Sequence, residues 1–343
     1  MTGFAIRIMT GLSFGILIAE VILRLIIPKV NVVTEADTKH YHWHKANMNY
    51  VFSGYPGNVK EFTIRGRWNS YGFNDVEHSF KKSNKYRIVN IGDSFVEAQQ
   101  VPMDRNFGVL LGQKLNVEVV NMGRSADGMV NASKAIPFAL KYSPDLIMIF
   151  FCSNDLVNDY DVLQNRDFEE REMLRPFSSI CFRPDNYTSK SRVVQFLGQK
   201  VNEYTYRNRV AKAFPGFRSV NLQMFDPVMS AEFAKAWEIS LAAILNAKKT
   251  SEASGVKFVL VLVADLLQLR PAANEFDPGK LERILAVFSK QNGINFIAMR
   301  NTFIQREAET DTRPFWKYDG HWNETGHVWV SEILESYIGR KFK

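Results

Sequence analysis

From Tyr86 onward, short apolar runs rich in β-branched residues alternate with longer segments whose apolar residues recur about every 3.6 positions. The short runs predict strands and the longer segments predict helices. We expect strands at Arg87–Ile91, Val117–Val120, Leu146–Phe151, Val256–Val263 and Asn295–Ala298, and helices at Arg105–Leu115, Met129–Tyr142, Ala231–Ala253, Lys280–Gln291 and Thr325–Ile338. Strands separated by helices pair in parallel, with helices on both faces. The alternation therefore predicts an α/β fold with a mostly parallel five-stranded sheet.

The first predicted strand ends at a serine. Gly92 and Asp93 break the apolar run just before Ser94. Since α/β sheets bind ligands beyond the carboxyl ends of their strands, the Ser94 hydroxyl is a candidate nucleophile. Serine is also favoured as the N-cap of a helix, and this stretch by itself leaves the two roles open.

The charge and the cysteine count limit the classes of protein to which this chain can belong. The 343 residues carry a net charge of +7, but their lysines and arginines are scattered through the chain. This distribution indicates a solvated surface or proximity to anionic lipid, not a nucleic-acid-binding protein. Cys152 and Cys181 are too few for a disulfide framework, and we expect both to be free.

Residues 4–27 are apolar apart from Arg7, Glu20 and Arg24. At about 1.5 Å per residue they are long enough, as a helix, to cross a ~30 Å hydrocarbon layer. Glu20 and Arg24 are spaced to pair on one helix face. No cleavage site with small residues follows, which favours a retained single-pass anchor over a removed signal peptide. We expect the amino terminus inside and the larger domain on the extracytoplasmic side.

Residues 29–85 form a juxtamembrane segment and linker. The motif His40-Tyr-His-Trp-His44 could hold a metal if it were a strand, but acidic or cysteine ligands at motif spacing do not accompany it. We interpret it as a polar, aromatic surface strand and expect no metal site. Asn69-Ser-Tyr-Gly-Phe73 is typical of a turn leading into the main domain.

Residues 156–230 interrupt the alternation. They are charged, aromatic and broken by prolines, with short helices expected near Ser191–Glu203. Either a lid or substrate-recognition element or an ordinary packing excursion would explain them. Four aromatic residues are candidates for stacking on a sugar: Trp68, Tyr160, Phe177 and Tyr187.

Three further polar stretches fall where the predicted strands end or the last helix begins. Gly123 follows the second strand, Asn154 follows the third, and His321 with Asp319 precedes the last helix. Each stretch by itself is typical of a turn. Their joint placement at one edge of the sheet predicts a nucleophile, two hydrogen-bond donors and a base.

These stretches together resemble the SGNH (GDSL-type) hydrolase superfamily over roughly Tyr86 to the end. Its four blocks are similar to Ile91-Gly-Asp-Ser94, Asn121-Met-Gly123, Ser153-Asn154-Asp155 and Asp319-Gly-His-Trp-Asn-Glu-Thr-Gly-His327. Residues 69–75, together with the anchor, also resemble the upstream region of membrane-tethered members. Cys152 stands where the third block usually has glycine, and its side chain either narrows the pocket or packs in the core. Asp319 lies two residues before His321, not the more frequent three, as in polysaccharide O-acetylation proteins.

The resemblance implies a flavodoxin-like three-layer sandwich and a serine hydrolase mechanism without metal or organic cofactor. It implies Ser94 as nucleophile, His321 as base and Asp319 as its orienting acid, with an oxyanion hole of Ser94, Gly123 and Asn154. We expect His327 to be structural or to cap a helix.

We thus divide the chain into an anchor (1–28), a juxtamembrane segment (29–85) and a hydrolase-like domain (86–343) with an insertion at about 156–230. The leading hypothesis is a membrane-anchored esterase or O-acyltransferase acting on an acetyl ester of a cell-envelope glycan. Its expected partners are an ester-bearing small molecule or glycan, the lipid bilayer and a membrane acyl-transfer protein, with no nucleic acid. The alternative is a catalytically silent tethered module that binds glycan or scaffolds a membrane protein.

Overall fold

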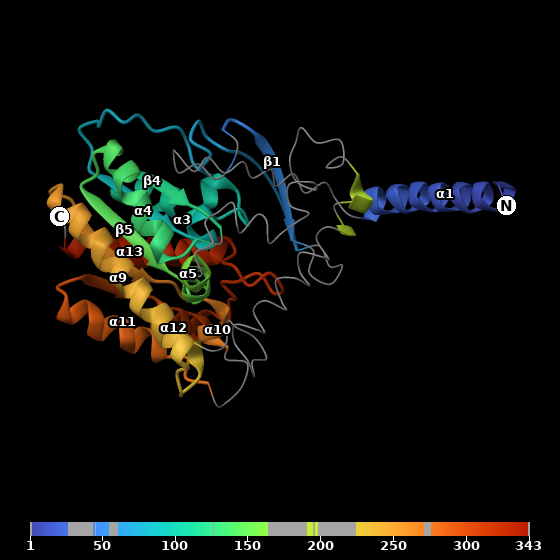
Figure 1. Ribbon diagram of the computed structural model, residues 1–343. Coiled ribbons are helices and arrows are strands. Elements are labelled where there is room, and N and C mark those ends of the chain that lie inside the picture. Colours follow the sequence, from blue (N-terminus) through green and yellow to red (C-terminus); the bar gives the residue numbers. More distant parts are fainter. Residues whose placement is uncertain are drawn as a thin grey trace. The chain divides into compact units, whose positions relative to one another are not determined.

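The computed structural model describes residues 2–26, 44, 46–54, 61–125, 127–163, 191–194, 196–197, 224–270 and 276–341 (Figure 1). The chain forms two compact units. One contains Met1–Glu35 and Arg166–Pro215, and the other contains Ala36–Asn165 and Gly216–Lys343. Some residues for which we made predictions from the sequence lie outside the described residues: residues 40–43, Phe177, Cys181 and Tyr187.

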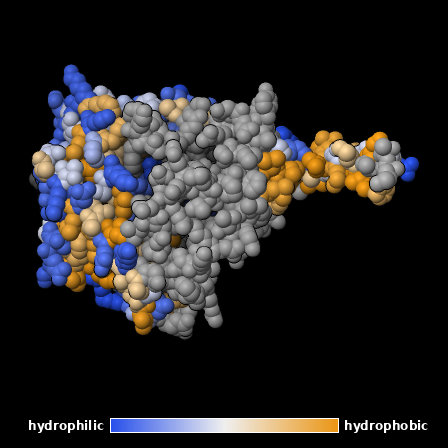
Figure 2. Space-filling model, viewed as in Figure 1, coloured by the Kyte–Doolittle hydropathy of each residue, from blue (hydrophilic) through white to orange (hydrophobic). Residues whose placement is uncertain are grey.

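The first unit contains helix α1 (Thr2–Ile26). Within it, Ile6–Leu25 is long and apolar enough to cross a membrane, and its side chains are not buried in the protein (Figure 2). Glu20 and Arg24 form the expected ion pair, with Nε 2.7 Å from Oε1. The Glu20 carboxylate also accepts the backbone N–H groups of Arg192 and Val193, both at 3.0 Å. Those two residues begin a short helical stretch, so Glu20 caps it from within the same unit.

The second unit is built on the predicted five-stranded parallel sheet. Its strand order is β4-β3-β5-β6-β7, the flavodoxin-like order. The strands are β3 (Arg87–Gly92), β4 (Glu118–Gly123), β5 (Leu146–Phe151), β6 (Lys257–Leu262) and β7 (Asn295–Ala298). The predicted α/β fold class is therefore confirmed. In the parallel register Gly92 pairs with Gly123, which brings the ends of β3 and β4 side by side.

Helices join the strands. They are α2 (Ser94–Glu97), α3 (Phe107–Leu115), α4 (Met129–Ala139), α5 (Asp155–Leu163), α9 (Ala231–Ala253), α10 (Leu266–Leu269), α11 (Lys280–Gln291), α12 (Arg300–Thr310) and α13 (Glu324–Lys341). Helix α3 begins two residues later than predicted because the Asn106 side chain caps it by accepting the N–H of Gly108 at 2.8 Å. Most of α5 falls in residues that the sequence assigned to the insertion.

The two faces of the sheet carry separate apolar layers, as alternating strand residues require. Met148 and Phe150 of β5 belong to a core cluster with residues of α3, α12 and α13. From the same strand, Phe151 stacks on Trp237 of α9, with ring centroids 5.6 Å apart and planes 7° apart. Helix α9 in turn packs against α4 and α5 (Figure 1). The sheet is thus covered on both sides.

An antiparallel hairpin precedes the sheet in the chain. It consists of β1 (Asn49–Gly54) and β2 (Phe62–Arg67), with Tyr50 opposite Gly66. The Tyr50 ring lies across Gly66, where an added Cβ would come within 2.4 Å of it. Tyr50 also stacks on Trp68, which is 1% exposed and cannot stack on a substrate as we expected.

His44 corrects the prediction of a polar surface strand. Its side chain is buried, its ring stacks on Trp68 at 3.5 Å between centroids, and its Nε2 pairs with the Glu97 carboxylate. A buried histidine needs such a partner, because a polar group removed from water must be hydrogen-bonded. The sequence pattern could not identify the partner of His44, because Glu97 lies far along the chain in α2.

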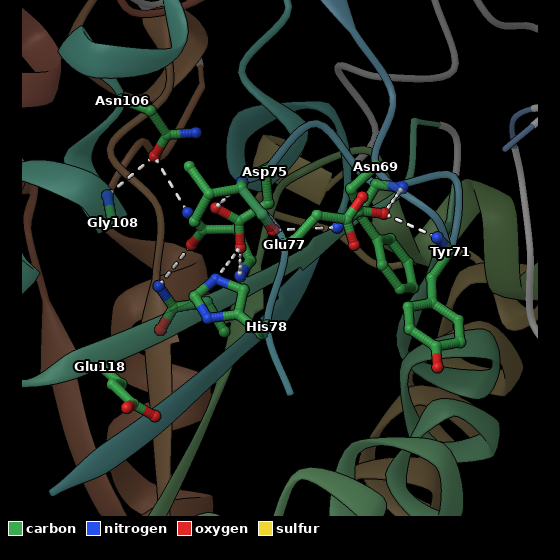
Figure 3. Close-up of polar contacts among 12 residues, drawn as sticks. Asn69, Tyr71, Asp75, Glu77, His78, Asn106, Gly108 and Glu118 are labelled. Carbon is green, nitrogen blue, oxygen red and sulfur yellow. Dashed lines mark hydrogen bonds and ion pairs between the residues drawn. The ribbon is translucent and has the colours of Figure 1, made fainter. Parts of the chain in front are cut away.

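The outer edge of β4 is covered by residues 74–78. Asp75 Oδ2 accepts the N–H of Asn121 at 2.7 Å and also lies 3.1 Å from His78 Nε2 (Figure 3). Asn90 of the neighbouring strand β3 is paired with Asn121 and donates its side-chain Nδ2–H to Asn121 Oδ1 at 2.8 Å. Because an open strand edge invites pairing with another chain, this cover blunts the edge of the sheet. The predicted turn at 69–73 leads into this segment, and Asn69 Oδ1 accepts the N–H groups of Tyr71 and Phe73.

Candidate active site

Ser94 is the first residue of α2, directly beyond the end of β3. The cap of this helix is Asp93, whose Oδ1 accepts the N–H of Phe95 at 3.0 Å. Between the cap and nucleophile roles left open by the sequence, the structure therefore gives the capping role to Asp93. The Ser94 hydroxyl faces another partner.

That partner is His321. Its Nε2 lies 2.7 Å from Ser94 Oγ, and its Nδ1 lies 2.6 Å from Asp319 Oδ1. Asp319 Oδ1 also lies 3.2 Å from the backbone N of His321. The three side chains thus form a continuous chain of hydrogen bonds, in the order needed for a base to take the hydroxyl proton while an acid orients it.

Neighbouring residues hold the imidazole in place. The next residue, Trp322, is fully buried and donates its Nε1–H to the carbonyl of Ala264, just beyond β6, at 2.8 Å. The Phe95 ring lies 4.8 Å from the His321 ring. His321 is therefore tied to the same sheet edge as Ser94.

His327 has a different environment. It is buried, and its Nδ1 accepts the N–H of Phe107 at 3.3 Å at the start of α3. Burial lowers the pKa of His327 to about 3, which keeps the ring neutral. His327 thus caps α3, while His321 contacts Ser94.

The two predicted oxyanion donors flank α2. Gly123 lies so close to this helix that a Cβ would be 2.0 Å from the backbone N of Glu97. This residue must therefore be glycine for packing reasons alone. Asn154 is half-buried at the start of α5, and its side chain hydrogen-bonds Asp93. Gly123 thus lies against α2, and Asn154 contacts Asp93, which caps that helix.

Several buried carboxyl groups surround the site. Burial raises the pKa of Asp93 to about 6, against the opposing effects of the Phe95 N–H and of His321. Burial and the nearby Asp93 raise the pKa of Asp155 well above its usual value, although Asp155 accepts the N–H of Cys152 at 2.7 Å. Cys152 itself is 1% exposed and belongs to the core cluster. Of its two proposed roles, the structure favours core packing.

Glu61 also contacts the loop that carries Asp319 and His321, and the sequence did not predict this contact. Its carboxylate accepts the N–H of Tyr318 at 3.0 Å and the N–H of Asp319 at 2.9 Å. The adjacent Phe62 ring lies 5.1 Å from the ring of Trp316. No local sequence signal marks Glu61, because its partners lie 257 and 258 residues further along the chain.

A family model described as GDSL-like lipase/acylhydrolase matches residues 88–334. The structure is also similar to those of several solved proteins at low sequence identity. One is the acetyl xylan esterase AlAXEase, with 13% identity, a TM-score of 0.43, and coverage of 74% of this chain and 99% of that one. Another is a lipolytic G-D-S-L family protein from Veillonella parvula, with 13% identity, a TM-score of 0.41 and coverage of 74% and 99%. A third is a catalytic mutant of Axe2, an acetylxylan esterase from Geobacillus stearothermophilus, with 12% identity, a TM-score of 0.43 and coverage of 76% and 97%. No curated protein matches the chain.

Proposed function

The chain belongs to the GDSL-like lipase/acylhydrolase family, and from this premise we propose that it cleaves or transfers acyl esters through a covalent ester on Ser94. The observation that carries the proposal is the hydrogen-bonded chain of Ser94, His321 and Asp319. A silent binding module has no need of such a chain, so this geometry favours the enzyme over the scaffold alternative.

In the proposed mechanism, His321 Nε2 takes the proton of the Ser94 hydroxyl as Oγ attacks the ester carbonyl. Asp319 stabilises the imidazolium that forms. The tetrahedral oxyanion accepts hydrogen bonds from the backbone N–H groups of Ser94 and Gly123 and from the Asn154 amide, each worth about 3 kcal/mol. His321 then gives its proton to the leaving alcohol, and Ser94 carries the acyl group.

The second half of the reaction regenerates Ser94. A water or sugar hydroxyl attacks the acyl–Ser94 ester while His321 accepts its proton, and the proton returns to Ser94 Oγ as the acyl group leaves. Water as acceptor gives hydrolysis, and a sugar gives transfer. Both outcomes use the same residues.

For the substrate, we propose an acetyl ester of a cell-envelope glycan. Support comes from the spacing of Asp319 and His321, which is similar to that of polysaccharide O-acetylation proteins. Of the four aromatic residues first considered for sugar stacking, Trp68 is excluded because it is buried. The proposal of a glycan substrate does not depend on Trp68 alone.

We further propose that α1 is a retained anchor that places the hydrolase domain on the extracytoplasmic side. The apolar Ile6–Leu25 window, with mean hydropathy 1.9, is consistent with a membrane span. A removed signal sequence would have similar composition. Finding residues 2–26 by mass spectrometry in the membrane-bound mature protein would exclude removal.

Fluorophosphonate labelling tests the enzymatic proposal. The full-length protein in detergent is treated with the probe, and intact mass together with peptide mapping identifies the labelled residue. We expect one adduct on Ser94 and none in the Ser94→Ala variant. An unlabelled wild-type protein would contradict the proposed catalytic role. Adding an O-acetylated glycan donor and a glycan acceptor then separates transfer, which forms acetylated acceptor, from hydrolysis, which releases acetate.

A further inference from the structure

The β1–β2 hairpin lies upstream of residues 88–334, which match the family, yet two residues that flank its strands, Glu61 and His44, contact the two parts of the site. One contact reaches the loop that carries Asp319 and His321. The other reaches α2, which begins with Ser94. The hairpin therefore connects two parts of the site that lie more than 200 residues apart, the Ser94–His321 separation being 227.

At the first contact, Glu61 directly precedes β2 and accepts two consecutive backbone N–H groups, those of Tyr318 and Asp319. The same loop is closed by hydrogen bonds from Trp316 N to the His321 carbonyl at 2.9 Å and from Gly320 N to the Trp316 carbonyl at 3.3 Å. Because the Glu61 carboxylate fixes the backbone of Asp319, it also fixes the acid that orients His321.

At the second contact, buried Glu97 ends α2 and pairs with His44. Its carboxylate also accepts the N–H and hydroxyl of Ser125, two residues beyond Gly123. Although burial raises the pKa of Glu97, the neighbouring His44 and the Ser125 hydroxyl bring it below its usual value, so the group is held as a carboxylate. This carboxylate joins the nucleophile helix to the loop after β4.

The hairpin joins these two contacts. His44 stacks on Trp68, which follows β2 and donates its backbone N–H to the carbonyl of Met48 at 3.0 Å. From β1, the Tyr50 hydroxyl donates to Asn74 Oδ1 at 2.8 Å, and Asn74 Nδ2 donates to the Glu97 carbonyl at 2.8 Å. The path from Glu61 through β2 to Glu97 is thus made of paired strands and buried hydrogen bonds, which are rigid elements.

We propose that the β1–β2 hairpin is a clamp that sets the distance between Ser94 and His321, and that Glu61 is a positioning residue for the catalytic loop. This inference deepens the proposed function, on which it rests. It adds a segment outside the family-matched residues to the machinery of the reaction. Glu61 acts through Asp319 and His321 and does not touch the reacting atoms.

The Glu61→Gln variant tests the clamp. A glutamine amide presents an NH₂ group to one of the two N–H groups, so one hydrogen bond is lost with little change in volume. The matched control is Glu77→Gln, because Glu77 (Figure 3) accepts the N–H of Ser70 at 2.7 Å and its hydroxyl at 2.6 Å, and neither hydrogen bond involves the loop that carries Asp319 and His321. Both variants are made in the full chain.

Small displacements of catalytic groups cost up to about 100-fold in rate. We therefore expect Glu61→Gln to lower kcat for a chromogenic acetyl ester about 10- to 100-fold while KM changes about twofold or less. Glu77→Gln should retain wild-type kcat. Glu61→Asp, which keeps the charge on a shorter chain, should recover part of the loss. Equal kcat values for Glu61→Gln and Glu77→Gln would overturn the proposal, as would a loss accounted for by the unfolded fraction.

Amide hydrogen exchange gives a readout that does not depend on activity. In the peptide covering residues 313–323, exchange should be faster in Glu61→Gln than in the wild type and in Glu77→Gln. Unchanged exchange would overturn the clamp even if the enzyme is active. Faster exchange in a protein that a fluorophosphonate does not label would support the clamp while contradicting the esterase proposal, so the two failures are distinguishable.

Discussion

Asp319 Oδ1 lies 2.6 Å from the ring Nδ1 of His321 and 3.2 Å from its backbone N. A single carboxylate oxygen therefore fixes both the ring and the backbone of the same residue. With the proton on Nδ1, the free lone pair of Nε2 faces Ser94, as a general base requires. Replacing Asp319 therefore tests best whether His321 must be oriented by a carboxylate or need only lie close to Ser94.

Replacing Asp319 by asparagine should lower kcat for a chromogenic acetyl ester by about 10⁴-fold, because the amide NH₂ favours the wrong imidazole tautomer. Steady-state kinetics of the purified variant measures the loss. A loss below about tenfold would mean that another carboxylate orients His321. Unchanged thermal unfolding would confirm that the effect is on chemistry.

Ser94→Ala and His321→Ala should each remove nearly all turnover, on the order of 10⁴- to 10⁶-fold, and the double variant should be hardly worse. The reason is that nucleophile and base act as one unit. His327→Gln is the matched control, since it removes a histidine from the same region but not from the hydrogen-bonded chain. Loss of activity in His327→Gln with retention in His321→Ala would assign the base to His327.

The buried His327 should make the fold sensitive to acid. Its pKa falls from about 6.5 in the unfolded chain to about 3 in the fold, so the unfolded state binds an extra proton as pH drops below 6.5. The contribution of neutral His327 to the free energy of unfolding is fully present above pH 6.5 and declines toward pH 3. The loss reaches roughly 3 kcal/mol at pH 4.5. Urea unfolding of wild type and His327→Gln between pH 7.5 and 4.5, at half-unit steps, gives the free energy of unfolding at each pH, and hence its slope against pH for each protein. Equal slopes would show that other groups dominate the acid response.

Cys152→Gly should destabilise the protein by about 2 kcal/mol, because it removes a core side chain and adds backbone freedom at the end of β5. Thermal unfolding measures this, and Cys152→Ala separates the lost thiol from the added freedom. We expect the acyl-length preference to stay unchanged in both variants. Faster turnover of longer acyl esters by Cys152→Gly would instead show that the thiol narrows the substrate pocket.

The sequence determined the elements with strong local signals. Strands Leu146–Phe151 and Asn295–Ala298 and helices Ala231–Ala253 and Lys280–Gln291 have the predicted bounds. Hydrophobic periodicity is a local property that follows from which face of each element is buried, so a single sequence contains it. Helix α12 was missed because Arg300–Thr310 is largely polar and shows little periodicity.

Candidate site residues could also be named, because three of the four motif blocks follow parallel strands, whose carboxyl ends meet at one edge, and the fourth precedes the last helix. Their roles in catalysis stay predictions until the variants are measured.

Only the tertiary structure decided which polar residues are paired. His44 was expected at the surface, and its partner Glu97 lies 53 positions away. Glu61 carries no local signal, and the N–H of Asp319 that it accepts lies 258 positions away. In the same way, only the structure shows that Asp93 caps α2 and that the Ser94 hydroxyl contacts His321. A buried polar group is stable only beside a complementary one, and across such separations that partner is set by how the chain folds back, not by the residues next to it.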